Sequence, residues 1–331
     1  MAYRVTVRDA EPTRLPGAGL PWDKSVKIAD CNSPAHWTDG KLVVFSSASH
    51  PWRAEGPDLF HLGEPTPVEW DREANGGRWI EATFKHPNET LYGWYHNEPL
   101  LDVFSVQNSG KDHKLTAPNI GSCRSFDDGR TWEDMGAILT VSDDSYFPET
   151  RNYYFGGGNG DFSVIVEGDY AYLPMGLYNR KVEEQGVGWA RLPIDRLDDP
   201  VGAAEKWFEG GWSQPGLKGR ATPTWPAKGD WHSVAPDVYW GPSIHWNRHL
   251  NCYVILLNRA IGTRWEPGGI YVSFGDSLAD PASWTEPEPI LEGGSWYPVA
   301  YGLENGDTDK SAGEVARLYL GVESRHELVF G

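Results

Sequence analysis

The stretch AHWTDGKLVVFSS, residues 35–47, decides the expected fold. Two strand-like runs flank Asp39-Gly40, a dipeptide typical of tight β-hairpin turns. Similar strand pairs recur at residues 79–96, 162–178, 243–257 and 297–322. Such repetition, at intervals of roughly 40 to 80 residues, is the sequence signature of a β-propeller. We therefore predict an all-β chain, a five-bladed β-propeller of four-stranded antiparallel blades.

The composition agrees with short strands. The 331 residues include 38 Gly and 25 Pro, which leave little room for long helices, and only residues 195–205 and 311–316 are helix candidates. Weaker strands at 122–126 and 269–274 supply the rest of each sheet. Residues 3–7 and 326–330 are also strand-like, and pairing them in one blade would close the ring and remove its edges. We therefore predict one domain over residues 1–331.

A second local motif supports the propeller. SFDDGRTW, residues 125–132, matches the Asp-box pattern S-x-D-x-G-x-T-W. In that hairpin the Asp accepts turn amides and the Trp packs beneath them. The motif is specific for propeller-like hairpins and says nothing about chemistry.

The charge balance limits the classes of binding partner. With 29 Lys and Arg against 47 Asp and Glu, the net charge is −18, which repels phosphate backbones and anionic lipid. We expect neither nucleic-acid nor membrane binding, and no stretch approaches the roughly 20 apolar residues of a membrane helix. Three widely spaced cysteines exclude a disulfide scaffold. Localisation stays open: periplasmic or extracellular if a signal was removed, otherwise cytoplasmic. The oligomeric state is also open.

Residues just before the first strand of each hairpin, and just after the second, should meet at the mouth of the central channel. We expect the catalytic groups to be Asp30, Glu81, His96, Glu98 and Asp161. We expect the substrate-binding groups to be His50, Trp52, Asn179, Arg180, Asp237, Trp240, Asn258, Arg259, Tyr297, Arg325 and His326. The 17 Trp and 15 Tyr suit core packing and also the C–H faces of sugars.

This arrangement resembles the five-bladed propeller glycoside hydrolases, the arabinanase/xylosidase and invertase/levansucrase groups, and related uncharacterised propellers. Asp30 precedes the first strand and the Asp39-Gly40-Lys41 turn, as the base or nucleophile of those enzymes does. Asp161, in GDFSV at 160–164, is similar to their second Asp in a D-P-S-V setting. Their general-acid Glu lies in an E-G-P context, where this chain has Trp240-Gly241-Pro242. The proton donor is therefore open, with Glu81 or Glu98 as candidates.

Glycoside hydrolysis needs a carboxylic acid at the leaving oxygen and a carboxylate on the opposite face of the sugar. Crowding several carboxylates should raise at least one pKa and so supply the acid. We predict an exo-acting glycoside hydrolase for an oligosaccharide or polysaccharide. One alternative is a polysaccharide lyase, in which Arg180, Arg259 or Arg325 neutralises a uronate and a His or Tyr takes the proton. Another is a non-catalytic sugar-binding propeller.

Metal binding has less support in the sequence. No H-E-x-x-H spacing occurs, and we assign no metal-ligating residue. No cofactor is expected to be required. An axial calcium ion held by scattered oxygen ligands is the one metal left open.

Overall fold

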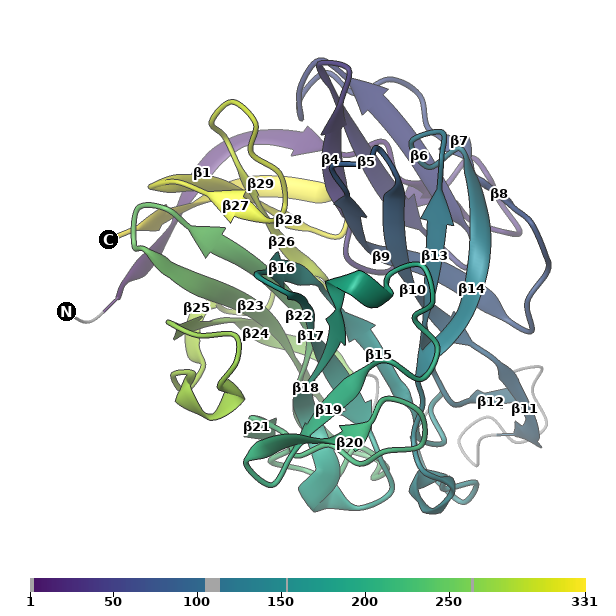
Figure 1. Ribbon diagram of the computed structural model, residues 1–331. Helices are drawn as coiled ribbons and strands as arrows, with labels where there is room; N and C mark the ends of the chain where they lie inside the picture. The colour runs from purple at the N-terminus through teal and green to yellow at the C-terminus, as the bar shows by residue number, and fades with distance from the viewer. Residues whose placement is uncertain (1–2, 105–113, 153, 263–264) are drawn as a thin grey trace.

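The structure, a computed structural model, describes residues 3–104, 114–152, 154–262 and 265–331 (Figure 1). Its secondary structure consists of β-strands and, among these residues, four 3-10 helices: Asp143–Ser145, Val182–Glu184, Ile194–Arg196 and Pro281–Ser283. The predicted all-β class is confirmed. Of the two helix candidates, 195–205 contains part of a single 3-10 turn, and 311–316 contains β27 (Ser311–Ala312). None of the described helices has the length and apolar character needed to cross a membrane.

The strands form sheets that follow one another along the chain. The first sheet has the order β4 (Ala35–Thr38), β5 (Lys41–Ser47), β6 (Pro51–Gly56), β7 (Thr66–Pro67). The second has the order β9 (Gly77–Lys85), β10 (Leu91–Glu98), β13 (Asn119–Ser125), β14 (Thr131–Leu139), β8 (Glu69–Trp70). The third contains β15 (Asn159–Phe162), β17 (Tyr170–Tyr178), β18 (Gln185–Pro193), β19 (Glu205–Phe208) and β20 (Gly211–Pro215), with β16 (Ile165–Glu167) on β17 and β21 (Trp225–Pro226) on β18.

Two further sheets complete the arrangement. The fourth has the order β27, β22 (Asp237–Asn247), β23 (Cys252–Ile261), β24 (Glu266–Gly275), β25 (Glu288–Leu291). The fifth has the order β26 (Pro298–Gly302), β28 (Val315–Leu320), β29 (Glu323–Phe330), β1 (Val5–Arg14). Two short ribbons, β2 (Ala18–Gly19) with β3 (Lys27–Ile28) and β11 (Leu100–Phe104) with β12 (Lys114–Thr116), stand apart.

The arrangement is that of a β-propeller, with four regular blades rather than the predicted five. The first, second, fourth and fifth sheets each have a linear order of four or five strands. The third sheet is irregular, because it has seven strands and two of them lie off the main path. Each predicted hairpin is nevertheless present, including the tight turn at Asp39 and Gly40, where both residues have positive φ.

Alternating side chains in β5 explain how the sheets pack. Val43 and Phe45 lie in a buried cluster with Ile80 and Trp132 of the second sheet. Leu42 and Val44 lie in another with residues of the fifth sheet, such as Tyr319. A strand whose two faces are both apolar must be covered on both sides, so β5 is fully buried from Leu42 onward.

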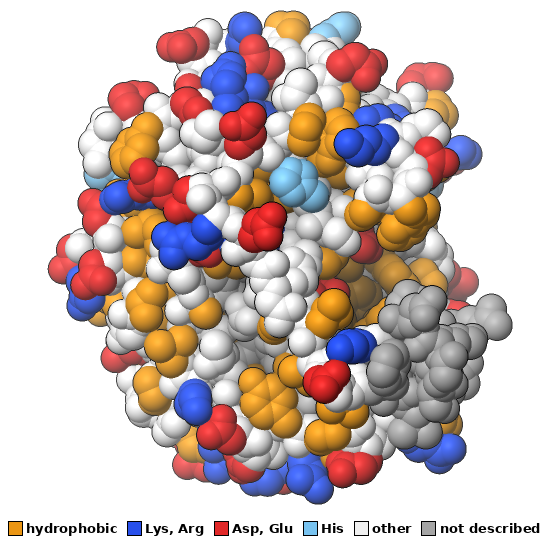
Figure 2. Space-filling model, turned by 90° about the vertical axis from the view of Figure 1, so that its right-hand side faces the viewer, with side chains coloured by type: hydrophobic (Ala, Val, Ile, Leu, Met, Phe, Trp, Pro, Cys, Tyr) orange, Lys and Arg blue, Asp and Glu red, His pale blue; other side chains and the backbone are white. Residues whose placement is uncertain are grey.

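The two ends of the chain meet in the fifth sheet. β1 pairs antiparallel with β29, from Val5 opposite Phe330 to Arg14 opposite Glu323, and Figure 1 shows the purple strand beside the yellow one. The strands predicted at both ends are therefore present. On the face seen in Figure 2, acidic and basic side chains are interspersed.

Candidate functional site

The inner strands of the sheets begin near one another, and polar side chains gather there. Glu81 lies on β9, His96 on the neighbouring β10 and Asp161 on β15. One ligand-capable atom of each lies within 4.8 Å of the others, and all three residues are buried. Two sheets therefore contribute to one compact carboxylate and imidazole group.

Two β-bulges aim these carboxylates. Ile80 pairs with Tyr95 and Ala82 with Trp94, which leaves Glu81 as the extra residue of a bulge. Asp161 is the extra residue between two pairs of β15 and β17, and its φ is +44°. A bulge re-aims a side chain that regular pleating would send elsewhere, and positive φ outside glycine is a strained conformation. Both carboxylates thus reach the centre as the extra residue of a bulge, and Asp161 does so at a local conformational cost.

His96 connects the carboxylates. Its Nδ1 lies 3.3 Å from Glu81 Oε1 and 3.9 Å from Asp161 Oδ1, and its Nε2 lies 3.3 Å from Glu98 Oε1. The Asp161 amide also points at Nδ1, at 3.0 Å, a bond that requires this nitrogen to be unprotonated. The carboxylates favour a protonated ring, so the carboxylate contacts and the Asp161 N–H oppose each other at Nδ1.

The surroundings shift the pKa values of this group. Burial alone would lower the pKa of His96, but Glu81 and Glu98 outweigh it and raise that pKa well above its usual value. Burial raises the pKa of Glu81 against the opposing effect of His96, and burial likewise raises the pKa of Asp161. The group therefore retains protons at neutral pH that isolated carboxyl groups would lose.

Asp30 stands at the same place but open to solvent. It lies just before β4, and its N–H donates to Ser47 O at 2.8 Å. Asp30 is exposed to solvent, but protein atoms surround its remaining sides and remove part of its hydration. This confinement, together with the charges of Glu98 and Asp161, raises the pKa of Asp30 to about 7. Glu98 is also accessible, with 31% of its side chain exposed, whereas the side chains of Glu81, His96 and Asp161 are at most 4% exposed.

Aromatic residues enclose the buried side of the group. The Tyr178 hydroxyl donates to Asp161 Oδ2, and burial together with the nearby charge of Asp161 raises the pKa of Tyr297 well above its usual value. Tyr297, with φ +58°, packs against Trp240 at 5.5 Å between ring centroids. Asn258 lies opposite Trp240 in β23, and neither polar atom of its buried amide has a hydrogen-bond partner among the described residues.

Asn32 joins three sheets beside this group. Its Nδ2 donates to Phe162 O at 2.8 Å and to Pro242 O at 2.9 Å. Pro242 lies in a third bulge, between the pairs of Trp240 and Ser243 with β23. The segment before β4 is thereby fixed against the third and fourth sheets.

Several predicted binding residues lie elsewhere. Asp237 and Arg259 form a bidentate ion pair, with both N–O distances 2.7 Å. Arg325 and His326 lie on β29, where His326 pairs in register with Asp9, because the chain turns at Gly321 straight into this strand. Among the described residues no contact joins these four to the carboxylate group, and their role in binding stays a prediction.

Other predicted residues are near the turns but make different contacts. Lys27 Nζ lies over the Trp52 ring, 4.2 Å from its centroid. Asn179 Nδ2 donates to Glu184 O at 2.9 Å, and the Arg180 guanidinium lies over the Phe147 ring at 5.0 Å. Among the described residues, none of these three contacts the carboxylate group, so the structure does not bring them to it. His50 lines a neighbouring cavity.

Sequence reasoning missed two contributors. Tyr178 is the last residue of its strand, one position before the predicted Asn179. In a strand rich in aromatic residues, its sequence gives no sign that its hydroxyl binds a carboxylate. Lys206 is a buried lysine whose Nζ donates to Thr140 O, Asn159 Oδ1 and Gly219 O at 2.6, 2.9 and 2.9 Å. It fixes Asn159 two residues before Asp161, and nothing in its local sequence indicated burial.

Glycine permits the close contact between β15 and His96. A Cβ on Gly160 would lie 2.5 Å from His96 Cε1. Any larger residue at 160 would displace the ring.

The group does not fit the axial calcium ion. Calcium takes six to eight oxygen ligands, whereas this group offers two carboxylates and an imidazole nitrogen. Glu81 Oε2 already accepts the Phe162 N–H at 3.1 Å, and Asp161 Oδ2 accepts the Tyr178 hydroxyl. We derive no step through a metal.

Comparisons with known proteins identify the fold. No family model matches the sequence, and no curated protein matches it. A thermostable family-43 glycoside hydrolase is similar in structure, with a TM-score of 0.55, 11% identity, and coverage of 96% of this chain and 91% of that one. A family 117 glycoside hydrolase of the marine bacterium Zobellia galactanivorans has a TM-score of 0.54 and 12% identity, and the match covers 98% of this chain and 90% of that one. An exo-beta-1,3-galactanase of Phanerochaete chrysosporium, solved as a variant with beta-1,3-galactotriose, has a TM-score of 0.51 and 12% identity. The match covers 99% of this chain and 64% of that one. The chain therefore shares the propeller arrangement of these glycoside hydrolases.

Proposed function

We propose that the protein is an exo-acting glycoside hydrolase of oligosaccharides or polysaccharides. The observation that carries the proposal is the combination of two accessible carboxyl groups, Asp30 and Glu98, with the buried Glu81, His96 and Asp161 behind them. Two carboxyl groups are what glycoside hydrolysis requires. The fold shared with glycoside hydrolases supports the class, and the exo-galactanase among them supports the exo mode.

In this proposal Asp30 is the proton donor and Glu98 the carboxylate on the opposite side. A pKa of about 7 keeps much of Asp30 protonated at neutral pH, as a general acid requires. Glu98 faces the imidazole of His96, whose raised pKa favours a positive charge beside it. This assignment reverses the role that the family resemblance implies for Asp30. Glu81, His96 and Asp161 are positioning residues, because solvent does not reach their side chains.

We also propose that the irregular third sheet is the fifth blade and that residues 1–331 form one domain closed by β1 and β29. Buried clusters between successive sheets support this proposal. They include Phe45 with Trp132, Trp94 with Phe162, Trp189 with Ile255, Leu256 with Leu318, and Tyr319 with Val44.

The lyase alternative has lost its support. Arg259 is neutralised by Asp237, Arg180 lies over Phe147, and Arg325 lies on the third strand of its sheet. A uronate would instead meet the carboxyl groups of Asp30 and Glu98, which repel it.

One set of assays tests the class. The protein is incubated with aryl glycosides and neutral oligosaccharides, including beta-1,3-galactotriose, and with oligogalacturonides. New reducing ends indicate a hydrolase, an unsaturated uronate absorbing in the ultraviolet indicates a lyase, and neither product indicates a binding protein.

Two variants test the roles. Asp30→Asn and Glu98→Ala should each lower kcat by about 10²- to 10⁴-fold. A dinitrophenyl leaving group, which needs no proton, should restore turnover only for Asp30→Asn, and azide only for Glu98→Ala. The exposed Glu64, changed to Gln, is the matched control. Full activity of Asp30→Asn on an unactivated substrate would refute the assignment.

A further inference from the structure

A cavity of about 740 Å³ lies between the first and second sheets, outside the carboxylate group. Ligand sites commonly have volumes of about 300–1,000 Å³. Its lining comes from the turn between β5 and β6 and from the segment that leads into β9: Ser49, His50, Val68, Trp70, Ala74 and Arg78, with acidic and basic neighbours.

The cavity adjoins the site on the side of Asp30. Ser47, at the end of β5, accepts the N–H of Asp30 on its carbonyl and that of Ile80 on its hydroxyl, at 2.8 and 3.1 Å. Two residues later, Ser49 O accepts the Arg78 N–H at 3.0 Å. One short turn therefore separates Asp30 from the cavity.

The cavity also adjoins the site on the side of Glu98. Gly76, which lines the cavity, has φ +82°, and a Cβ there would lie 1.8 Å from Glu98 O. The backbone of Glu98 is thus packed directly behind the cavity wall. The cavity is therefore adjacent to the backbone that carries Asp30 on one side and Glu98 on the other.

His50, in the lining of the cavity, supplies a hydrogen-bond acceptor. Its Nε2 lies 2.9 Å from Val68 O, so this nitrogen carries the proton and Nδ1 presents a lone pair. Burial lowers the pKa of His50, which keeps the ring neutral at pH 7. Nδ1 has no hydrogen-bond partner among the described residues. A neutral imidazole nitrogen accepts a hydroxyl group and offers nothing to a carboxylate.

The charges of the lining select against anions. Arg78 lies 3.1 Å from Asp134 and Arg72 lies 3.2 Å from Asp71, so both cations are neutralised. Glu69 and Glu73 are exposed and form no ion pair with the described residues. A uronate would be repelled here, whereas a neutral sugar can donate its hydroxyls to these carboxylates and to His50.

We propose that this cavity is a second sugar subsite, which holds a neutral sugar unit next to the one that is cleaved. The inference rests on the proposed hydrolase function and adds the substrate class: a neutral oligosaccharide of at least two units. Turnover should then become more efficient when the substrate is long enough to enter the cavity.

The kinetic test fills the cavity. Ala74 is exposed on the cavity wall. We compare kcat/KM for a neutral trisaccharide that the protein cleaves, such as beta-1,3-galactotriose, with kcat/KM for the matching aryl monoglycoside. Ala74→Trp should lower the ratio of the first to the second by about tenfold. Glu314→Trp, at an exposed position outside the lining, is the matched control. An unchanged ratio in Ala74→Trp would overturn the subsite while leaving the hydrolase function in place.

A binding test separates the two proposals. In Asp30→Asn the ring resonances of His50, assigned by His50→Gln, should shift on addition of the neutral trisaccharide and not of trigalacturonate. A shift without turnover by the unaltered protein would support the subsite and refute the hydrolase. No shift with any neutral probe, or an equal shift with trigalacturonate, would refute the subsite.

Discussion

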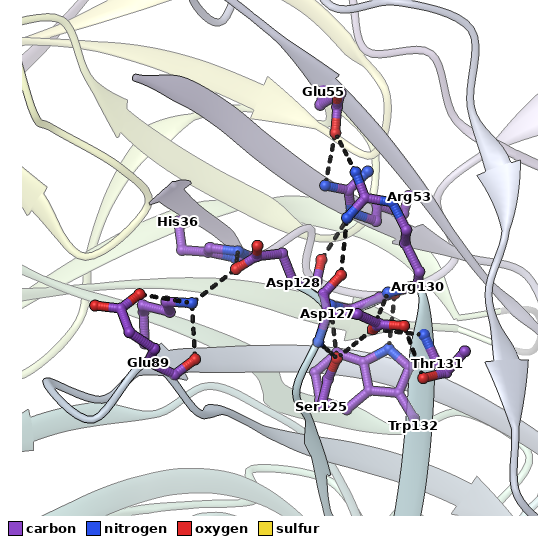
Figure 3. Close-up of polar contacts among 12 residues, drawn as sticks. His36, Arg53, Glu55, Glu89, Ser125, Asp127, Asp128, Arg130, Thr131 and Trp132 are labelled. Atoms are coloured by element: carbon purple, nitrogen blue, oxygen red, sulfur yellow. Dashed lines mark hydrogen bonds and ion pairs between the residues drawn. The ribbon is translucent and has the colours of Figure 1, made fainter. Parts of the chain in front are cut away.

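Asp127 should be a major source of stability in the turn between β13 and β14 of the second sheet. Its Oδ1 accepts the N–H groups of Arg130 and Thr131 at 3.1 and 2.9 Å and the Ser125 hydroxyl at 2.8 Å, and its Oδ2 accepts the Thr131 hydroxyl at 2.8 Å (Figure 3). Bonds to a charged group contribute about 1.5–3 kcal/mol each when buried. Water replaces part of them here because Arg130 and Thr131 are exposed, so Asp127→Ala should cost about 2–4 kcal/mol.

Thermal and urea unfolding measure this loss. An unfolding entropy of about 2.1 cal/mol/K per residue gives roughly 0.7 kcal/mol/K for this length, and hence a fall in Tm of about 3–6 °C. Burial opposes ionisation, but the hydrogen bonds lower the folded-state pKa of Asp127. Its contribution is therefore present above the unfolded pKa and is lost as the pH falls through the folded one. Glu64→Ala is the control for the charge change. If both variants unfold alike at pH 7, or if the difference does not shrink as the pH falls below the unfolded pKa of an aspartate, the reasoning is wrong. The rate per folded molecule should not change.

Four further outcomes are expected. The kcat/KM should fall as the pH rises through about 7, because Asp30 then loses its proton, and a pH profile of Asp30→Asn on an activated substrate should lack this limb. Gly160→Ala should lower kcat by about 10²-fold or more by moving His96, with circular dichroism unchanged; wild-type kcat would contradict the contact. Burial lowers the pKa of Lys206 to about 7. Between about pH 7 and 10 this lysine is then protonated in the unfolded chain but not in the folded one, so the free energy of unfolding should rise with pH. Urea unfolding of Lys206→Met should show no such rise. Chelation with EDTA should leave kcat unchanged, and reactivation by calcium would revive the axial ion.

The hairpins could be predicted from the sequence because their signals are local. The turn at Asp39-Gly40 and the alternation of residues 42–45 depend only on neighbours along the chain. The same holds for the strands at both ends. The irregular third sheet differs because β16 and β21 attach to its side, and such pairings leave no trace in a local pattern.

The site was harder to predict because bulges shape it. Period-two alternation gives no reason for Glu81 and Asp161 to share a centre, and each needs an extra residue in its strand to do so. Asp237 shows a second difficulty, because the Arg259 of the recurring Asn-Arg pattern is its ion-pair partner on the adjacent strand β23. Ion pairing across adjacent strands and convergence on a channel look the same in a sequence.

The amide of Asn32 has a consequence for how the chain folds. Its partners lie 130 and 210 residues farther along, so neither bond can form until two distant sheets are in place. Contacts of such separation slow folding, because the loops they close must first lose their freedom. The hydrogen bonds of Asn32 should therefore form late in folding, after the individual hairpins. Substitution of Asn32 should speed unfolding far more than it slows folding. The centre of the propeller would then act as a kinetic latch.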